Sequence, residues 1–268
     1  MSTTLPQTND FGGTPLVSLQ AIAEAIRANG TDCEIVGDAF TEIRGVAIDS
    51  RKATATCLFI CKGAGFKPAF LESAIASGAV AYLCQGELDE QGKLTEPADL
   101  AAAAAGTPAI VAADVRRAMA AASKVAYDDP SAALNIVGIT GTKGKTTTSY
   151  MLLAITAAAE VSTSILGSIE TDDGIEEFES CNTTPESPDL WRHLSNTVAS
   201  GRAHMVMEVS SQALKYDRVL GLTLNIACFL NIGRDHISPA EHPTFEDYFE
   251  SKLRIFGQCK CAVVNLGA

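Results

Sequence analysis

The segment that most constrains the fold of this 268-residue chain is NIVGITGTKGKTTT, residues 135–148. An apolar run leads into a glycine-rich turn, which continues through Gly144-Lys145-Thr146 into a stretch with helical character. Glycines allow successive backbone N–H groups to converge on phosphate oxygens at a helix N-terminus. The lysine adds a cation near the terminal phosphates, and the threonine hydroxyl can hold Mg²⁺. The pattern therefore predicts a strand, a phosphate-binding loop and a helix.

The spacing of this loop departs from the commonest phosphate loop. That loop has a glycine five positions before the Gly-Lys pair, where this chain has Ile139, flanked by Gly138 and Gly141. A glycine-rich turn that only packs is the alternative reading.

Apolar strands and amphipathic helices alternate on both sides of the loop. After it, the pattern predicts strands at 161–166, 204–209, 225–230 and 262–265, with helices at 145–159, 188–200 and 244–256. Strands separated by helices indicate a parallel, doubly wound α/β sheet. Before it, strands are expected at 43–48, 57–61, 79–84 and 109–112, with helices beginning at Ser18, near 69 and at 114. The segment 128–131, Asp-Asp-Pro-Ser, is the best candidate for a linker.

Charge and composition narrow the possible partners. The net charge is −12, and no basic arm or stripe is present, which argues against nucleic acid or an anionic membrane as the main partner. Residues 1–15 lack the pattern of a signal peptide, and no apolar run approaches the roughly 18 residues that span a bilayer. The cysteines lie mainly in apolar segments, including Cys57, Cys61, Cys84, Cys228 and Cys261, as expected of buried, reduced thiols. We therefore expect a cytoplasmic protein.

Several motifs carry a family resemblance. The spacing Gly138-x-x-Gly141-Thr142-x-Gly144-Lys145-Thr146 resembles the ATP loop of the Mur ligase and folylpolyglutamate synthetase superfamily. Other segments are similar to the tripeptide synthetases of the Mur ligase family (MurE), in the same order along almost the whole chain. These segments are GVAIDSR (45–51), CLFI (57–60), NTTPE (182–186), MEVSS (207–211), Asn231-x-x-Arg-Asp-His236 and Tyr248-Phe-x-x-Lys252.

The resemblance implies ATP-dependent ligation of an amino acid to UDP-N-acetylmuramoyl-L-alanyl-D-glutamate in peptidoglycan precursor synthesis. The glutamyl carboxylate would attack the γ-phosphorus of ATP to give an acyl phosphate and ADP, and the incoming amine would then displace phosphate. ATP and Mg²⁺ are the implied cofactors, the partners are these small molecules, and we expect a monomer. The stretches around Gln212 and at 241–248 are more similar to the lysine-adding branch. L-Lysine is therefore favoured over meso-diaminopimelate, which stays open.

The resemblance also assigns the nucleotide site. The ATP-binding residues it implies are Gly141, Thr142, Lys143, Gly144, Lys145, Thr146 and Thr147, with Lys145, Glu208 and Lys252 as catalytic residues. Glu208 ends an apolar strand before a Ser-Ser turn, which predicts a place at the carboxyl edge of the sheet, where ligands bind. The implied metal ligands are Thr146, Glu208, His236 and Lys252 as a carbamate. A turn-capping role for Glu208 and a solvated loop for His236 are the plainer readings.

Lys252 is also distinguished by periodicity. Phe245, Phe249, Lys252 and Phe256 follow one another at helical spacing, so the lysine lies on an apolar stripe. Such a lysine either extends its amine to the surface or is buried with a lowered pKa, which favours reaction of the neutral amine with CO₂.

For the nucleotide-sugar substrate, the resemblance points to Ser50 at the uridine end. Nearer the muramoyl-peptide it points to Asn182, Thr183, Thr184, Ser210 and Arg218. Hydroxyls and an arginine suit phosphate and carboxylate oxygens. The acidic stretch 170–179 is expected to be a solvated loop rather than a metal site, and Trp191 and Met205 are expected in the core.

The implied organisation is an α/β UDP-substrate domain at 1–128, followed by a P-loop-type ATPase domain with a mostly parallel sheet at 132–268. We expect the second domain to be incomplete and a C-terminal amino-acid-binding domain to be absent, so that this chain alone would be inactive. A non-catalytic UDP-sugar or nucleotide-binding fragment is one alternative. A sister ligase such as folylpolyglutamate synthetase is another, although the Asp49-Ser50-Arg51 segment speaks against it.

Overall fold

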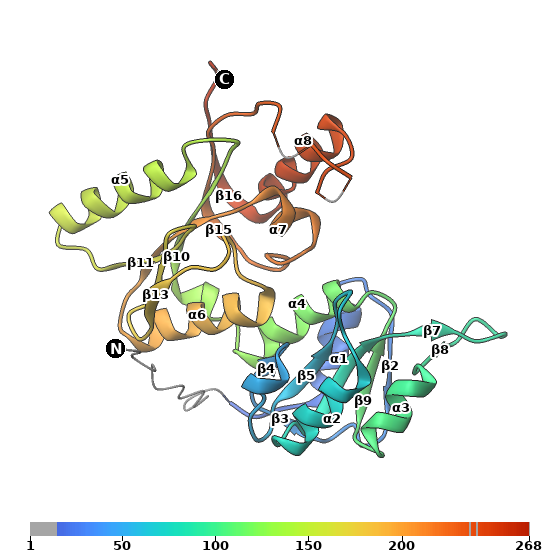
Figure 1. Ribbon diagram of the computed structural model, residues 1–268. Coiled ribbons are helices and arrows are strands. Elements are labelled where there is room, and N and C mark those ends of the chain that lie inside the picture. The colour runs from blue at the N-terminus through green and yellow to red at the C-terminus, as the bar shows by residue number, and fades with distance from the viewer. Residues whose placement is uncertain (1–14, 236, 240, 268) are drawn as a thin grey trace, which may run out of the picture. The chain divides into compact units, whose positions relative to one another are not determined.

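A computed structural model describes residues 15–235, 237–239 and 241–267 (Figure 1). The chain divides into two compact units, one ending at Asp128 and the other starting at Asp129. Both aspartates have positive φ angles, 57° and 41°. The 3₁₀ turn Pro130–Ala133 follows them, so helix α4 (Val115–Ala126) cannot continue past this point. The boundary therefore lies in the Asp-Asp-Pro-Ser segment.

The first unit is built on a five-stranded sheet with the order β2-β9-β6-β5-β4, parallel except for the antiparallel pair β2 and β9. Its strands are β2 (Cys33–Val36), β4 (Val46–Ala47), β5 (Leu58–Cys61), β6 (Ala81–Gln85) and β9 (Ala109–Ala112). Its other helices are α1 (Leu19–Ala28), α2 (Pro68–Ala76) and α3 (Ala98–Ala104).

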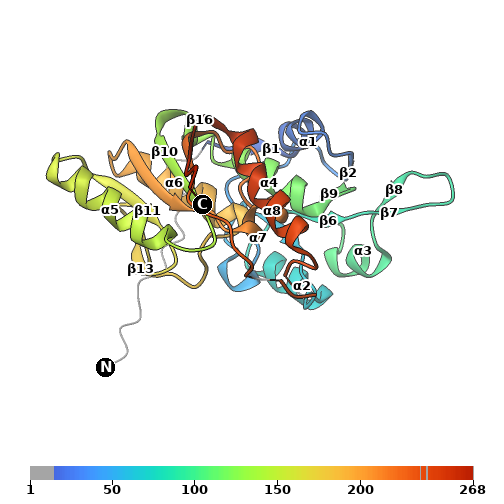
Figure 2. The ribbon, with the colours of Figure 1, turned by 90° about the horizontal axis from the view of Figure 1, so that it is seen from above.

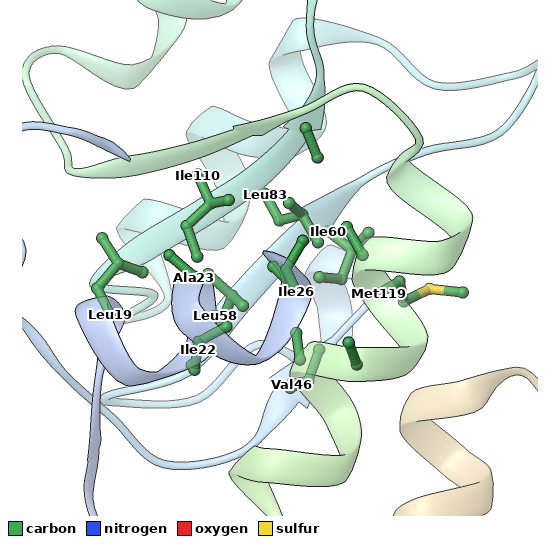
Figure 3. Packing of buried hydrophobic residues seen from close by; sticks show 14 of the residues in the cluster. Leu19, Ile22, Ala23, Ile26, Val46, Leu58, Ile60, Leu83, Ile110 and Met119 are labelled. Carbon is green, nitrogen blue, oxygen red and sulfur yellow. The ribbon is translucent and has the colours of Figure 1, made fainter. Parts of the chain in front are cut away.

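Both faces of this sheet are covered, which explains why its central strands are continuous apolar runs. On one face, Leu58 and Ile60 pack with α1 and with Met119 of α4 (Figure 3). On the other face, Phe59 packs with residues of α2 and α3, such as Leu71. Helix α1 starts as predicted, because the Ser18 side chain accepts a hydrogen bond from the backbone N–H of Ala21.

Two segments of the first unit differ from expectation. The strand expected at 43–48 is divided into β3 (Glu42–Ile43), which pairs with β1 (Val17–Ser18), and β4. Gly45 between them has a φ of 79°, which ends one strand and redirects the chain. A small hairpin of β7 (Glu87–Leu88) and β8 (Leu94–Thr95) lies between the strands expected at 79–84 and 109–112, where no further strand was expected.

The second unit contains a seven-stranded sheet with the order β13-β12-β11-β14-β10-β15-β16. Five adjacent strands run parallel to one another, in the order β11, β14, β10, β15 and β16. Strands β12 and β13 add an antiparallel edge beside β11. The prediction of a mostly parallel α/β sheet is confirmed. The strands are β10 (Asn135–Thr140), β11 (Thr163–Leu166), β12 (Glu170–Asp172), β13 (Glu177–Glu179), β14 (His204–Glu208), β15 (Leu224–Phe229) and β16 (Cys259–Val264).

Four α-helices of the second unit are described: α5 (Lys145–Ala158), α6 (Ser187–Ala199), α7 (Ser211–Lys215) and α8 (Phe245–Leu253). Helix α5 runs beside β11 and packs on β10 and β14 as well (Figures 1 and 2). Trp191 of α6 and Met205 of β14 are fully buried, as predicted. None of the helices within the described ranges is long and apolar enough to cross a membrane.

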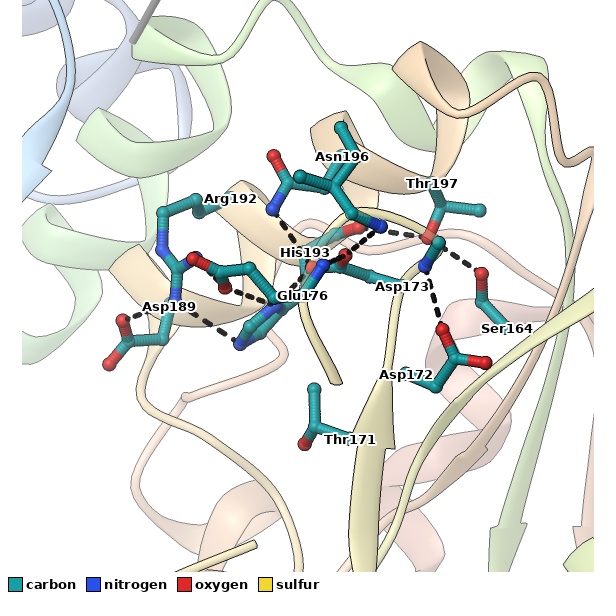
Figure 4. A network of polar contacts seen from close by, with 12 residues as sticks. Ser164, Thr171, Asp172, Asp173, Glu176, Asp189, Arg192, His193, Asn196 and Thr197 are labelled. Atoms are coloured by element: carbon teal, nitrogen blue, oxygen red, sulfur yellow. Dashed lines mark hydrogen bonds and ion pairs between the residues drawn. The ribbon is translucent and has the colours of Figure 1, made fainter. Parts of the chain in front are cut away.

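The acidic stretch 170–179 is not a solvated loop. It forms the hairpin of β12 and β13, and Asp173 between the strands is fully buried. The Asp173 carboxylate accepts hydrogen bonds from the backbone N–H groups of Ile175 and Glu176 and from the side chains of His193 and Asn196 of α6 (Figure 4). These hydrogen-bond partners take the place of water around the Asp173 carboxylate. The number of acidic residues in the stretch therefore does not predict that the stretch is exposed.

The cysteines follow the prediction only in part. All eight are free thiols, and Cys57, Cys61 and Cys84 are buried. Cys261 is exposed, because β16 is the edge strand of its sheet, and Cys228 beside it is half-buried. The expectation of burial was therefore wrong for Cys261.

Candidate functional site

The predicted phosphate loop connects β10 to α5. The loop leaves the sheet after Thr140. Gly144 immediately precedes the first turn of α5 and has a φ of 85°. This left-handed conformation carries no steric cost for glycine. The backbone N–H groups at the start of α5 have no partner within the helix, so they can bind an anion.

Lys145 folds back over this loop. Its ammonium group donates hydrogen bonds to the carbonyl oxygens of Gly141 at 3.1 Å and Thr142 at 3.4 Å. Burial lowers the pKa of Lys145, and the nearby Glu208 carboxylate opposes that shift. The Lys145 ammonium group is therefore held at the loop by two neutral carbonyl oxygens, and phosphate oxygens can replace them as hydrogen-bond acceptors.

Glu208 ends β14, next to β10 at the centre of the sheet, and is only 1% exposed. It accepts a hydrogen bond from the Thr146 hydroxyl at 3.1 Å and another from the backbone N–H of Ser168 at 3.0 Å. A Cβ atom at Gly167 would lie 2.9 Å from Glu208 Oε1, so a larger residue there would displace this carboxylate. The structure thus brings together two of the predicted metal ligands, Thr146 and Glu208.

Carboxylate and hydroxyl oxygens are hard donors of the kind that Mg²⁺ prefers. The donor set of Thr146 and Glu208 therefore fits Mg²⁺ beside a phosphate loop. His236, another predicted ligand, lies outside the described residues. Ser168 was missed by the sequence reasoning, although its hydroxyl lies 3.1 Å from Glu208 Oε2. A polar residue just after a predicted strand, at the same carboxyl edge as Glu208, was the signal that could have found it.

Lys252 is buried, with 2% of its surface exposed, so its amine does not extend to the solvent. The amine donates a hydrogen bond to the Gly141 carbonyl at 3.0 Å and lies 3.5 Å from Thr140 Oγ1. Burial, with a smaller effect from the cation of Lys145, lowers the pKa of Lys252 to about 7. A large fraction of this amine is therefore neutral near pH 7, as carbamate formation requires.

Two residues not assigned by sequence shape the loop. Asn231 Oδ1 accepts hydrogen bonds from the backbone N–H groups of Thr142 and Lys143, both at 3.0 Å, and its Nδ2 donates to the Lys143 carbonyl. The Tyr248 hydroxyl lies 3.0 Å from Thr142 Oγ1. Asn231 begins a motif quoted for the resemblance, which was the signal that could have assigned it.

Most residues expected at the muramoyl-peptide end gather beside Glu208. Thr184 is buried and its hydroxyl donates to the Glu208 carbonyl at 2.9 Å and accepts from the backbone N–H of Ser210 at 3.0 Å. Arg218 forms an ion pair with Glu186 at 3.0 Å and donates to the Thr184 carbonyl at 3.1 Å.

The other residues expected to bind the nucleotide-sugar substrate are less buried. The Thr183 hydroxyl lies 3.0 Å from Ser168 Oγ, and Asn182 is exposed. Ser50 belongs to the first unit, where it starts the 3₁₀ turn Ser50–Lys52.

The comparisons with known proteins agree with this geometry. Residues 139–267 match the Mur ligase middle domain. Over 84% of its length the chain is 42% identical to the UDP-N-acetylmuramoyl-L-alanyl-D-glutamate–L-lysine ligase of Enterococcus faecalis, of which it covers 42%. It is also 42% identical to a UDP-N-acetylmuramyl-tripeptide synthetase of Latilactobacillus sakei, covering 85% of this chain and 43% of that protein. Residues 139–267 of the chain therefore form a Mur ligase middle domain.

Solved structures of Mur ligases have the same fold. A UDP-N-acetylmuramoyl-L-alanyl-D-glutamate–2,6-diaminopimelate ligase superposes on 94% of the chain with a TM-score of 0.70 and 26% identity, and 48% of that protein is covered. MurF of Thermotoga maritima, solved in complex with ADP, shares the fold with a TM-score of 0.53 and 19% identity, over 82% of this chain and 45% of its own. The chain spans 42–43% of the length of these two curated Mur ligase relatives.

Proposed function

We propose that the chain forms the substrate-binding and ATP-binding part of a ligase that adds L-lysine to UDP-N-acetylmuramoyl-L-alanyl-D-glutamate. The hydrogen bond between Thr146 and Glu208 is the main structural support, because it places a carboxylate and a hydroxyl at the mouth of a phosphate loop. The Enterococcus faecalis relative, at 42% identity, is an L-lysine ligase, which supports lysine as the added amino acid. The diaminopimelate ligase resembles the chain at 26% identity, which makes meso-diaminopimelate the second choice.

In this proposal the phosphate loop, residues 141–147, binds the phosphates of ATP. Thr146 and Glu208 hold Mg²⁺, together with His236 and the carbamate of Lys252. Bound there, Mg²⁺ would neutralise negative charge on phosphate oxygens. Lys145 leaves its carbonyl partners and contacts the terminal phosphates, where its positive charge stabilises the negative charge that develops during transfer.

The nucleotide-sugar substrate is assigned to both units. We assign the uridine end to the first unit, residues 1–128, through Ser50. The muramoyl-peptide lies against Asn182, Thr183, Thr184, Ser210 and Arg218 in the second unit, residues 132–268. Arg218 already contacts one carboxylate, that of Glu186, and is suited to another on the substrate. We further propose a monomer in the cytoplasm, where free thiols such as Cys57 stay reduced.

The test is calorimetric binding of Mg-ATP and of the UDP-linked dipeptide to this chain, followed by an assay of ADP release. We expect both ligands to bind, and L-lysine to stimulate any ADP release more than meso-diaminopimelate does. Failure of both ligands to bind would contradict the proposal. The second candidate is a non-catalytic UDP-sugar and nucleotide-binding protein, and ADP release that L-lysine stimulates would exclude it.

A further inference from the structure

Three side chains of the second unit form a hydrogen-bonded series that the proposed function does not use. His242 Nδ1 lies 2.6 Å from Asp247 Oδ2, and His242 Nε2 lies 2.9 Å from Ser211 Oγ. His242 is fully buried and Ser211 is 6% exposed. Asp247 Oδ2 also accepts a hydrogen bond from Lys215 at 2.7 Å.

The order serine, histidine, aspartate matches that of hydrolytic triads, but burial rules out the same role. A nucleophilic serine must meet a substrate carbonyl, and neither Ser211 nor His242 is open to one. The carboxylate beside Nδ1 favours the tautomer with the proton on Nδ1, which leaves Nε2 to accept from the Ser211 hydroxyl. His242 is therefore a fixed bridge between two elements.

The bridge joins α8, which carries Lys252, to the start of α7, which follows Glu208 at the end of β14. Ser211 is the first residue of α7 and lies three positions after Glu208. Asp247 lies in the first turn of α8, the helix that carries Lys252. Lys215, the last residue of α7, contacts the same Asp247 oxygen, so α8 is attached to both ends of α7.

A second contact connects the bridge to the phosphate loop. The Tyr248 ring packs edge-on against the His242 imidazole with 5.1 Å between ring centroids. The hydroxyl of the same tyrosine lies 3.0 Å from Thr142 Oγ1. A displaced imidazole would therefore disturb the loop as well as the two helices.

We propose that His242 is a positioning residue, which fixes Glu208 and Lys252 at the separation that Mg²⁺ binding requires. The inference rests on the proposed function, because it takes these two residues as metal ligands. Partners that hold metal ligands in place typically contribute about 10-fold to 100-fold in metal affinity.

Two variants of His242 each keep one half of the bridge. In His242→Asn the amide can replace Nδ1 and contact Asp247 but not Ser211, whereas in His242→Gln it can reach Ser211 but not Asp247. Ser211→Ala is a milder change that removes only one hydroxyl. The control is His193→Asn, because His193 is a second buried histidine with its Nδ1 2.6 Å from an aspartate, Asp173, and it belongs to α6.

The probe is Mn²⁺ with ADP, titrated into the full chain and followed by electron paramagnetic resonance, with Tm measured alongside. Both His242 variants should weaken Mn²⁺ binding about 10-fold or more, and Ser211→Ala should weaken it by a smaller factor. His193→Asn should lower Tm and leave the Mn²⁺ affinity unchanged. Wild-type affinity in folded His242 variants and in Ser211→Ala would overturn this inference alone. No Mn²⁺ binding by the wild-type chain would overturn the proposed function, and this inference with it.

Discussion

Lys252 has a buried amine with a pKa of about 7, so its protonation affects the stability of the second unit. In the unfolded chain a lysine has a pKa of about 10.4. Between these values the unfolded state binds more protons than the folded state, so stability rises as pH increases. Below pH 7 the amine of Lys252 is protonated in the folded state too, so folding carries the full free-energy cost of burying a cation.

Lys252→Met should therefore stabilise the second unit most near pH 6 and progressively less towards pH 10. Urea unfolding of wild type and variant at several pH values measures the difference. Lys260→Met, at an exposed position of β16, is the matched control and should give a difference that does not change with pH in this way. Parallel profiles for wild type and Lys252→Met would contradict the burial argument.

Carbamate formation is a separate consequence of the neutral amine. Wild-type protein incubated with ¹³C-bicarbonate at pH 8 should show a carbamate resonance that is absent from Lys252→Arg, because a guanidinium stays charged. A resonance that persists in Lys252→Arg would assign the carbamate to another amine.

Asn231 holds the phosphate loop through three hydrogen bonds. Asn231→Ala should weaken ADP binding by about 10-fold, because the loop N–H and C=O groups lose neutral partners worth about 1 kcal/mol each. Asn231→Asp keeps the acceptor for the two N–H groups but places a negative charge against the Lys143 carbonyl and beside the phosphates of ADP, so calorimetry should find at least as large a loss of affinity. Equal affinities for wild type and Asn231→Ala would show that the loop keeps its shape without this side chain.

At the scale of elements, the β12–β13 hairpin is attached to α6 by one buried carboxylate. Burial alone would raise the pKa of Asp173, but hydrogen bonds from His193, the Glu176 backbone and Asn196 lower it below its usual value. Glu176 and His193 place ligand atoms within 4.8 Å of the Asp173 carboxylate. Arg192, however, contacts Glu176 and lies 3.3 Å from His193 Nε2. A cation is therefore already present, and the cluster is best described as a structural network.

Asp173→Ala should destabilise the second unit by about 3 kcal/mol, since it leaves several buried donors without an acceptor. A carboxyl group whose pKa is lowered by folding contributes above its unfolded pKa of about 3.9 and loses that contribution as pH falls through the folded value. The difference between wild type and variant in chemical unfolding should therefore shrink below about pH 4. A difference that stays constant down to pH 3 would contradict this account.

Elements with a strong local pattern could be predicted from sequence. The phosphate loop, α1 with its Ser18 cap, and β9 occur where the residues indicated them. Lys252 was placed on a buried helix face by its spacing from Phe245 and Phe249, although Phe249 itself is 36% exposed. These features depend on neighbours within one or two turns of the chain.

The features that sequence did not reveal depend on residues far apart in the chain. Asn231 contacts the loop across 89 positions, and Asp173 meets His193 across 20 positions. Ser168 reaches Glu208 across 40 positions. No periodicity relates such partners, because the order of strands in the sheet decides which of them meet.

At the scale of the whole molecule, the chain consists of two units with separate sheets. The first unit has apolar clusters on both faces of its sheet. A fragment of residues 1–128 should therefore fold alone and show a cooperative thermal transition by circular dichroism. Its Tm should not change with Mg-ADP, whereas Mg-ADP should raise a transition of the full chain. An unfolded fragment would show that the first unit depends on the second.

We propose that Thr146 and Glu208 hold Mg²⁺ for a nucleotide bound at the phosphate loop. Calorimetric titration of ADP into wild type and Glu208→Gln, with and without Mg²⁺, tests this most directly. We predict that Mg²⁺ strengthens ADP binding by about 10-fold or more in the wild type and has little effect in Glu208→Gln, since a neutral amide is a poorer Mg²⁺ ligand than a carboxylate. The same Mg²⁺ effect in both proteins, or no ADP binding by the wild type, would contradict the claim.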